Sequence, residues 1–286
     1  MSELSPQAEA IKLARLWQTV SGSQFPVRAG DLAMEWSRQV ARDEPIAEVR
    51  AEALDRFEGG LFWLKNKGVW VVLYRPHEYS PGRSNFTIGH EFGHYVLHRK
   101  RQLTFECSQG DTLGAGAKME READEFASFL LMPINDFRQQ VAAHWMTLEL
   151  MGHCASRYQV SLTAATLKWL SFTEQSAILV TAREGMVLWW RASDSARRLA
   201  VAHLRSGMEL PLPSLAATPT LAVSPEDFRS GVEHRPGVWV PGISVREMTI
   251  ISDRYDMTLS LLVLEAPGVV HDEEPDSDMI TEPPTF

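Results

Sequence analysis

The chain has 286 residues, 44% of them hydrophobic, which predicts two domains with a packed core. Six acidic and no basic side chains in residues 272–282 account for most of the formal net charge of −9, and this balance does not favour direct nucleic-acid binding. Two cysteines argue against a disulfide-stapled secreted protein. With no signal-peptide pattern and no apolar run near 18 residues, we expect a cytoplasmic protein without a membrane span.

Two helices are predicted before residue 45. Ser5-Pro6 is typical of a helix start, and the apolar positions of this helix are Ile11, Ala14, Leu16 and Trp17. A second helix is predicted from Gly30-Asp31 to about Arg42, with three residues facing inward, namely Leu32, Trp36 and Val40.

Residues 59–74 predict a β-hairpin, because two apolar runs flank the turn sequence Asn66-Lys67-Gly68. Residues 101–118 are polar and rich in glycine, and are predicted to form a loop over or beside the functional site.

Between these segments lies an H-E-x-x-H pattern, His90-Glu91-Phe92-Gly93-His94. On a helix, His90 and His94 would share one face about 6 Å apart along the axis, so both imidazoles could hold one Zn²⁺. Glu91 flanks that face and could take a proton from a water molecule that the metal has acidified. The pattern predicts metal-assisted hydrolysis of a peptide bond. The alternative is a His/Glu pair on an amphipathic helix without metal.

A catalytic zinc ion normally has three protein ligands, and residues 119–133 can supply the third. This segment predicts a helix that ends near Pro133. Helical spacing places four of its residues on one face: Glu120, Ala123, Asp124 and Ala127. The two alanines would let this helix approach the H-E-x-x-H helix closely. An ordinary amphipathic helix with a solvated acidic face is the alternative.

Glu120 is the first candidate for the third ligand, and Glu122 is the second. Asp124 could accept a hydrogen bond from the outer N–H of a ligand histidine. His98 continues the series 90, 94, 98, but it lies about 12 Å along the helix axis from His90, too far to share a metal ion. We therefore expect His98 to have a structural role or to support a ligand.

Further helices are predicted at 135–152 and 161–170. After Phe172 the pattern changes to strands: a hairpin over 177–190 with a turn at Glu184-Gly185, then strand-like runs at 238–240 and 259–264. From residue 267 onward, the acidic, proline-containing composition is typical of a disordered tail.

The stretches Asn85–His98 and Glu120–Pro133, with a weaker match at Val160–Leu167, resemble the ImmA/IrrE-type zinc metallopeptidases. The resemblance covers about residues 55–172. It implies a gluzincin-like fold in which a small sheet accompanies the H-E-x-x-H helix and a second helix carries a Glu ligand. It also implies that a strand of the 59–74 region forms the sheet edge beside the active site. The chain has Asp124 where the family commonly has Asn, and Thr166 where it often has Arg.

We therefore expect an α+β protein with four parts. These are N-terminal helices over residues 1–45, a helical zinc-metallopeptidase domain with a small β-sheet over 46–172, a β-rich sensory or substrate-positioning domain over 173–266, and a tail over 267–286.

The resemblance implies a cytosolic zinc-dependent endopeptidase that cleaves a helix-turn-helix transcriptional repressor and so switches on a stress, phage or mobile-element response. In this interpretation His90, His94 and Glu120 bind Zn²⁺, and Glu91 is the general base. The alternative is a docking module or toxin–antitoxin partner that binds a regulator on the same scaffold without turnover.

Overall fold

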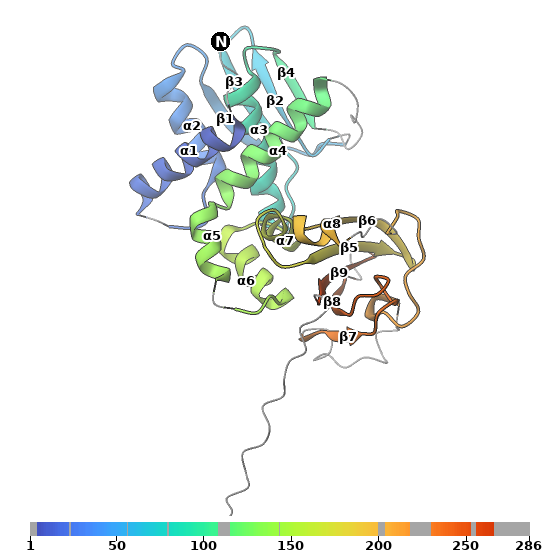
Figure 1. Ribbon diagram of the computed structural model, residues 1–286. Helices are drawn as coiled ribbons and strands as arrows, with labels where there is room; N and C mark the ends of the chain where they lie inside the picture. Colours follow the sequence, from blue (N-terminus) through green and yellow to red (C-terminus); the bar gives the residue numbers. More distant parts are fainter. Residues whose placement is uncertain are drawn as a thin grey trace, which may run out of the picture.

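Figure 1 shows a computed structural model of the chain, in which a helical part with one β-sheet is followed by a second, β-rich part. The fold class is α+β, as predicted. The structure describes residues 5–22, 24–55, 57–78, 80–107, 115–142, 144–199, 204–217, 230–252 and 256–265. The predicted disordered tail lies outside these residues. None of the helices in the described ranges combines the length and the apolar character needed to cross a bilayer.

Two N-terminal helices are present as predicted, α1 (Pro6–Ser21) and α2 (Ala29–Val40). The Ser5 hydroxyl accepts a hydrogen bond from the Ala8 amide and so caps α1. The inward assignment of Val40 was wrong, since this side chain is 61% exposed. The buried residues of α1 are Ala10, Leu13 and Ala14, and Val40 is the last residue of α2.

The first sheet contains β1 (Ile46–Ala51), β2 (Gly59–Leu64), β3 (Val69–Tyr74) and β4 (Thr104–Cys107) in the order β1-β3-β2-β4. Strands β2 and β3 form the predicted antiparallel hairpin. Neither of them is an edge, because β1 pairs in parallel with β3 and β4 pairs with β2. The expected edge strand in the 59–74 region was therefore wrong, and β4 forms the edge next to β2.

The loop prediction for residues 101–118 was wrong at both ends, since 104–107 form β4 and α4 begins at Ala115. Strand β4 alternates polar and apolar residues, and its Phe105 is buried. Four residues are too short a run for that alternation to stand out in the sequence. Residues 108–114 lie outside the described ranges.

Helix α3 (Pro81–His98) contains the H-E-x-x-H pattern and packs between the first sheet and α4 (Ala115–Leu131). The two helices approach closely where Gly93 faces Ala123. A Cβ atom at position 93 would lie only 3.2 Å from the Ala123 backbone. This contact confirms the expected close approach of the two helices, and it depends on small residues on both sides.

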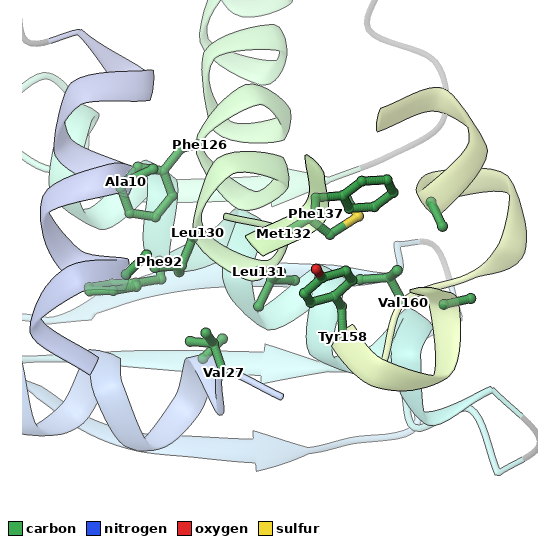
Figure 2. Packing of buried hydrophobic residues seen from close by; sticks show 14 of the residues in the cluster. Ala10, Val27, Phe92, Phe126, Leu130, Leu131, Met132, Phe137, Tyr158 and Val160 are labelled. Atoms are coloured by element: carbon green, nitrogen blue, oxygen red, sulfur yellow. The ribbon is translucent and has the colours of Figure 1, made fainter. Parts of the chain in front are cut away.

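Helices α5 (Ile134–Val141), α6 (Leu148–Tyr158) and α7 (Leu162–Leu170) complete the helical part. The single helix predicted over 135–152 is interrupted before Leu148, because the Thr147 hydroxyl accepts a hydrogen bond from the Leu150 amide and starts a new helix. The helix predicted at 161–170 is confirmed. Figure 2 shows the core where side chains from five helices meet, among them Ala10, Phe92, Phe126, Leu130, Phe137 and Tyr158.

The second sheet has the order β6-β5-β9-β8-β7, with all neighbours antiparallel. Its strands are β5 (Ala177–Arg183), β6 (Met186–Ala192), β7 (Val232–His234), β8 (Val245–Ser252) and β9 (Met257–Leu264). The hairpin over 177–190 and the strand at 259–264 are confirmed. A short helix, α8 (Asp194–Arg198), and a 3-10 turn at Leu215–Ala217 accompany the sheet.

Both faces of the second sheet are buried. In β5, Leu179 belongs to the core shared with the helices, whereas Ile178 and Val180 belong to a separate C-terminal core, as strand alternation requires. The strand predicted at 238–240 was wrong. These residues lie in a turn region, in which the Val238 amide donates to the Arg235 carbonyl and the Gly237 amide donates to the Val240 carbonyl. Trp239 is buried in the C-terminal core.

Candidate metal centre

Helix α3 presents His90 and His94 one turn apart, and α4 brings Glu120 to the same place. The Nε2 atoms of the two histidines are 3.0 Å apart. The Glu120 carboxylate places Oε2 3.2 Å from His90 Nε2 and Oε1 3.2 Å from His94 Nε2. Both histidines are buried, whereas a third of the Glu120 side chain is exposed. In the described part of the chain, these three residues form the group that could hold a metal ion.

Each of the two histidines contacts a second residue through its outer nitrogen. His90 Nδ1 lies 2.8 Å from Asp124 Oδ1, the contact expected from helical spacing. His94 Nδ1 lies 3.1 Å from His98 Nδ1, and His98 Nε2 lies 2.8 Å from Glu122 Oε2. Glu122 is therefore placed as a partner of His98 rather than beside His90 and His94.

These contacts fix where the imidazole protons lie. Asp124 can only accept, so His90 carries its proton on Nδ1. Glu122 likewise accepts from His98 Nε2, which leaves His98 Nδ1 to accept from His94 Nδ1. In this arrangement, both Nε2 lone pairs point at each other and at a carboxylate. Three acceptors that converge in this way create a site for a cation.

The electrostatics of the site support the same charge states. Burial lowers the pKa of His94 to about 4 and also lowers the pKa of His98, so both rings are neutral near pH 7. Burial alone would raise the pKa of Glu120, but the contacts of its carboxylate with the His90 and His94 rings outweigh burial and hold that pKa well below its ordinary value. Two neutral imidazoles and one carboxylate are a common ligand set for catalytic zinc.

The geometry also fits a tetrahedral ion. Tetrahedral bonds of about 2.0–2.1 Å separate ligand atoms by about 3.3–3.4 Å. The two Nε2 atoms are 3.0 Å apart, and each lies 3.2 Å from one oxygen of the Glu120 carboxylate, which is close to that value. A metal ion with three protein ligands would fit here with small adjustments of the side chains.

Glu91 is fully buried and lies against the start of β2. Its Oε1 lies 3.0 Å from the position that a Cβ atom on Gly59 would occupy. The general base proposed from the sequence is thus held between α3 and the first sheet, one residue along the chain from His90.

Strand β4 contributes a residue that the sequence reasoning missed. The Phe105 ring stacks on the His94 ring, with centroids 4.6 Å apart and an interplanar angle of 27°. The polar and apolar alternation in residues 104–107 is too short a signal to have identified it. Tyr95, next to His94, points away from the site, since its hydroxyl donates to the Glu44 carbonyl.

Comparisons with known proteins identify the helical part. Residues 43–170 match the IrrE N-terminal-like domain, peptidase family M78. This region contains His90, Glu91, His94 and Glu120, so the match to the ImmA/IrrE-type family covers the candidate metal centre. No curated protein matches the chain.

A solved structure similar to this chain is a Mycobacterium tuberculosis transcriptional regulator. The two share 16% sequence identity with a TM-score of 0.52, over 89% of this chain and 75% of the other. At this identity the likeness establishes a similar fold, which extends well beyond residues 43–170.

Proposed function

We propose that the protein is a zinc-dependent endopeptidase, with His90, His94 and Glu120 as the zinc ligands. The observation that carries this proposal is the convergence of His90 Nε2, His94 Nε2 and the Glu120 carboxylate. The two nitrogens are 3.0 Å apart, and each lies 3.2 Å from one carboxylate oxygen. The match of residues 43–170 to a metallopeptidase family model supports it independently.

Zn²⁺ bound at this site would polarise a peptide carbonyl and acidify a water molecule. Glu91 would take the proton from the attacking water and pass it to the leaving amine, so that its carboxylate ends each cycle ionised. Asp124 and the His98–Glu122 pair would keep the two ligand rings in the orientation and tautomer that binding needs.

We further propose that the substrate is an extended segment of a protein. Strand β4 is the edge of the first sheet, and its Phe105 touches His94, so a segment paired with β4 would lie beside the ligands. Within the family resemblance, a helix-turn-helix repressor in the cytoplasm is the substrate we favour, and its cleavage would switch on a stress, phage or mobile-element response. Residues 46–172 would then be the peptidase domain, and the β-rich domain over 173–266 would sense a ligand or position the substrate.

The variant Glu91→Gln tests the mechanism. We expect it to retain zinc and to lose about 10²–10⁴-fold in kcat, because the amide cannot accept the proton. Cleavage of candidate helix-turn-helix repressors is followed by electrophoresis, and Glu149→Gln, at an exposed position on α6, is the matched control. Unchanged cleavage by zinc-loaded Glu91→Gln would refute the role of Glu91. A wild-type protein that binds a repressor without cleaving it would indicate the docking module instead.

A further inference from the structure

Gly59, the first residue of β2, occupies a position where no side chain fits. A Cβ atom built there would lie 2.4 Å from Thr87 Cγ2 and 3.0 Å from Glu91 Oε1. Gly59 is not among the glycines with positive φ, so its backbone does not require glycine. Position 59 therefore favours glycine because a side chain there would clash with Thr87 and Glu91.

The two side chains that fill this space come from one face of α3. The Thr87 hydroxyl donates to the Arg83 carbonyl at 3.1 Å, which fixes the rotamer and turns the methyl group toward Gly59. Glu91 follows one helical turn later and is fully buried. The backbone of β2 thus forms one wall against the Glu91 carboxylate, and the Thr87 methyl group stands beside it.

The neighbouring Gly60 serves the other face of the sheet. A Cβ atom there would lie 2.7 Å from the Phe62 ring and 2.9 Å from the Phe105 carbonyl oxygen. Strand alternation thus gives the two glycines different roles: Gly60 makes room toward β4, and Gly59 makes room for the side chain of Glu91.

We propose that Gly59 is a positioning residue for Glu91. With no side chain at position 59, β2 supports the Glu91 carboxylate directly through its backbone, and Thr87 limits the carboxylate to one orientation. This inference rests on the proposed function, in which Glu91 is the general base. In this proposal, Gly59 affects the reaction through the position of Glu91 and not through contact with the substrate or the metal.

The test compares zinc-loaded wild type with Gly59→Ala. The first readout is the position of the Glu91 carboxylate in crystal structures of both proteins. The second is zinc content, and the third is kcat and KM on fluorescein-labelled casein. We expect the carboxylate to move by about 1 Å or more, zinc content to stay the same, and kcat to fall about 10–100-fold with KM unchanged.

The matched control is Gly30→Ala, which adds a methyl group that also faces α3. At position 30 the nearest atoms are Val49 Cγ1 at 3.4 Å and Ile88 Cγ2 at 3.8 Å, which are ordinary contacts. We expect this control to keep the kcat of wild type. Any general effect of a methyl group packed against α3 would appear in both variants.

The double variant Gly59→Ala/Thr87→Ser guards against a failure to fold. Serine keeps the hydroxyl that bonds to Arg83 but removes the methyl group 2.4 Å from the new side chain. We expect the double variant to fold and to have a kcat between those of Gly59→Ala and Thr87→Ser. If Gly59→Ala does not fold, the comparison is the double variant against Thr87→Ser, with a several-fold lower kcat expected.

Three results would overturn the positioning role: an unmoved carboxylate with normal kcat, an unmoved carboxylate with reduced kcat, or a displaced carboxylate with normal kcat. Loss of zinc in Gly59→Ala would also contradict it, since the strand would then act on the ligands. Failure of the wild type to cleave casein would count against the endopeptidase proposal, whereas the crystal structures would still decide whether Gly59 places Glu91.

Discussion

Each half of the molecule buries histidine and glutamate side chains together, but the two sites have opposite hydrogen-bond patterns. In the second sheet, Glu247 on β8 is fully buried and lies 2.8 Å from His234 Nε2. Donors surround its carboxylate, namely Trp239 Nε1, Thr249 Oγ1 and the amides of Leu215 and Ala216. Burial alone would raise the pKa of Glu247, but these hydrogen bonds hold it below its ordinary value.

In the candidate metal centre, the lone pairs of His90, His94 and Glu120 converge on one another. Donors that surround a carboxylate satisfy it and leave no room for an ion, so Glu247 organises the C-terminal core. Acceptors that converge need a cation to be satisfied. A buried cluster of histidine and glutamate is therefore not in itself a metal site, and the direction of the hydrogen bonds distinguishes the two cases.

The largest effect on stability is expected from Glu247→Ala. The change leaves several buried donors without an acceptor, so we expect the free energy of unfolding to fall by about 3–5 kcal/mol. Urea unfolding measures this loss, and zinc content should stay at the wild-type level. A loss of zinc in Glu247→Ala would contradict the assignment of Glu247 to the C-terminal core and of Glu120 to the metal centre.

Gly93→Ala tests the close approach that the metal centre needs. The added methyl group would lie 3.1 Å from the Phe126 ring and 3.2 Å from the Ala123 backbone, so α4 must shift and carry Glu120 with it. Overpacking of this kind costs about 1–3 kcal/mol, and we expect zinc affinity to fall about tenfold or more.

Competition with a chromophoric chelator measures the zinc affinity of Gly93→Ala. Gly152→Ala on α6, where nothing lies within 4 Å of the new methyl group, is the control. Unchanged zinc affinity in Gly93→Ala would mean that Glu120 is placed independently of the α3–α4 contact.

Lys168 on α7 differs from both of these sites, because it is a buried hydrogen-bond donor without an acceptor in the described part of the chain. Within the described ranges its ammonium group has no hydrogen-bond partner, and Nζ lies 3.3 Å above the Phe129 ring. Burial lowers the pKa of Lys168 from 10.5 to about 8, against the opposing effect of Glu125. Because burial of the charge is unfavourable, we expect Lys168→Met to stabilise the protein by about 1–3 kcal/mol at pH 7.

The burial of Lys168 should also make the free energy of unfolding depend on pH. Between pH 8 and 10.5, the unfolded chain holds a proton on Lys168 that the folded chain has lost, so wild-type stability rises with pH in this window. Lys168→Met should lack this rise, whereas Lys67→Met, at an exposed position, should keep it. Parallel pH profiles of wild type and Lys168→Met in urea unfolding would contradict the prediction.

The smallest effect is expected from Asp124→Asn. The asparagine Oδ1 can still accept from His90 Nδ1, so zinc affinity should change by less than about tenfold. Asp124→Ala removes the acceptor and should weaken zinc binding by about 10–100-fold. Equal zinc affinity in the alanine and asparagine variants would show that this hydrogen bond does not orient His90.

Local patterns in the sequence predicted the parts of the structure that local geometry determines. Helical spacing placed Glu120 on the alanine face of its helix and placed Asp124 within reach of His90, and the structure has both there. The 177–190 hairpin followed from its Glu184-Gly185 turn, where both residues adopt positive φ.

Tertiary contacts determine the parts that the sequence could not predict. The apolar run at 238–240 is typical of a strand, but Trp239 instead donates a hydrogen bond to the buried Glu247 on β8. Strand β4 was missed because its stability comes from pairing with β2. The pairing of His98 with Glu122 requires α3 and α4 to be docked, which no local pattern encodes.

The most direct test of the central claim is the metal content of wild type, His90→Ala, Glu120→Ala and Glu247→Gln, by elemental analysis of the purified proteins. We predict about one zinc ion per chain in wild type and Glu247→Gln, and none in His90→Ala or Glu120→Ala. Zinc retained in Glu120→Ala but lost in His90→Ala would move the third ligand to Glu122 or elsewhere. A folded wild-type protein without zinc, even after zinc is supplied, would contradict the metallopeptidase account.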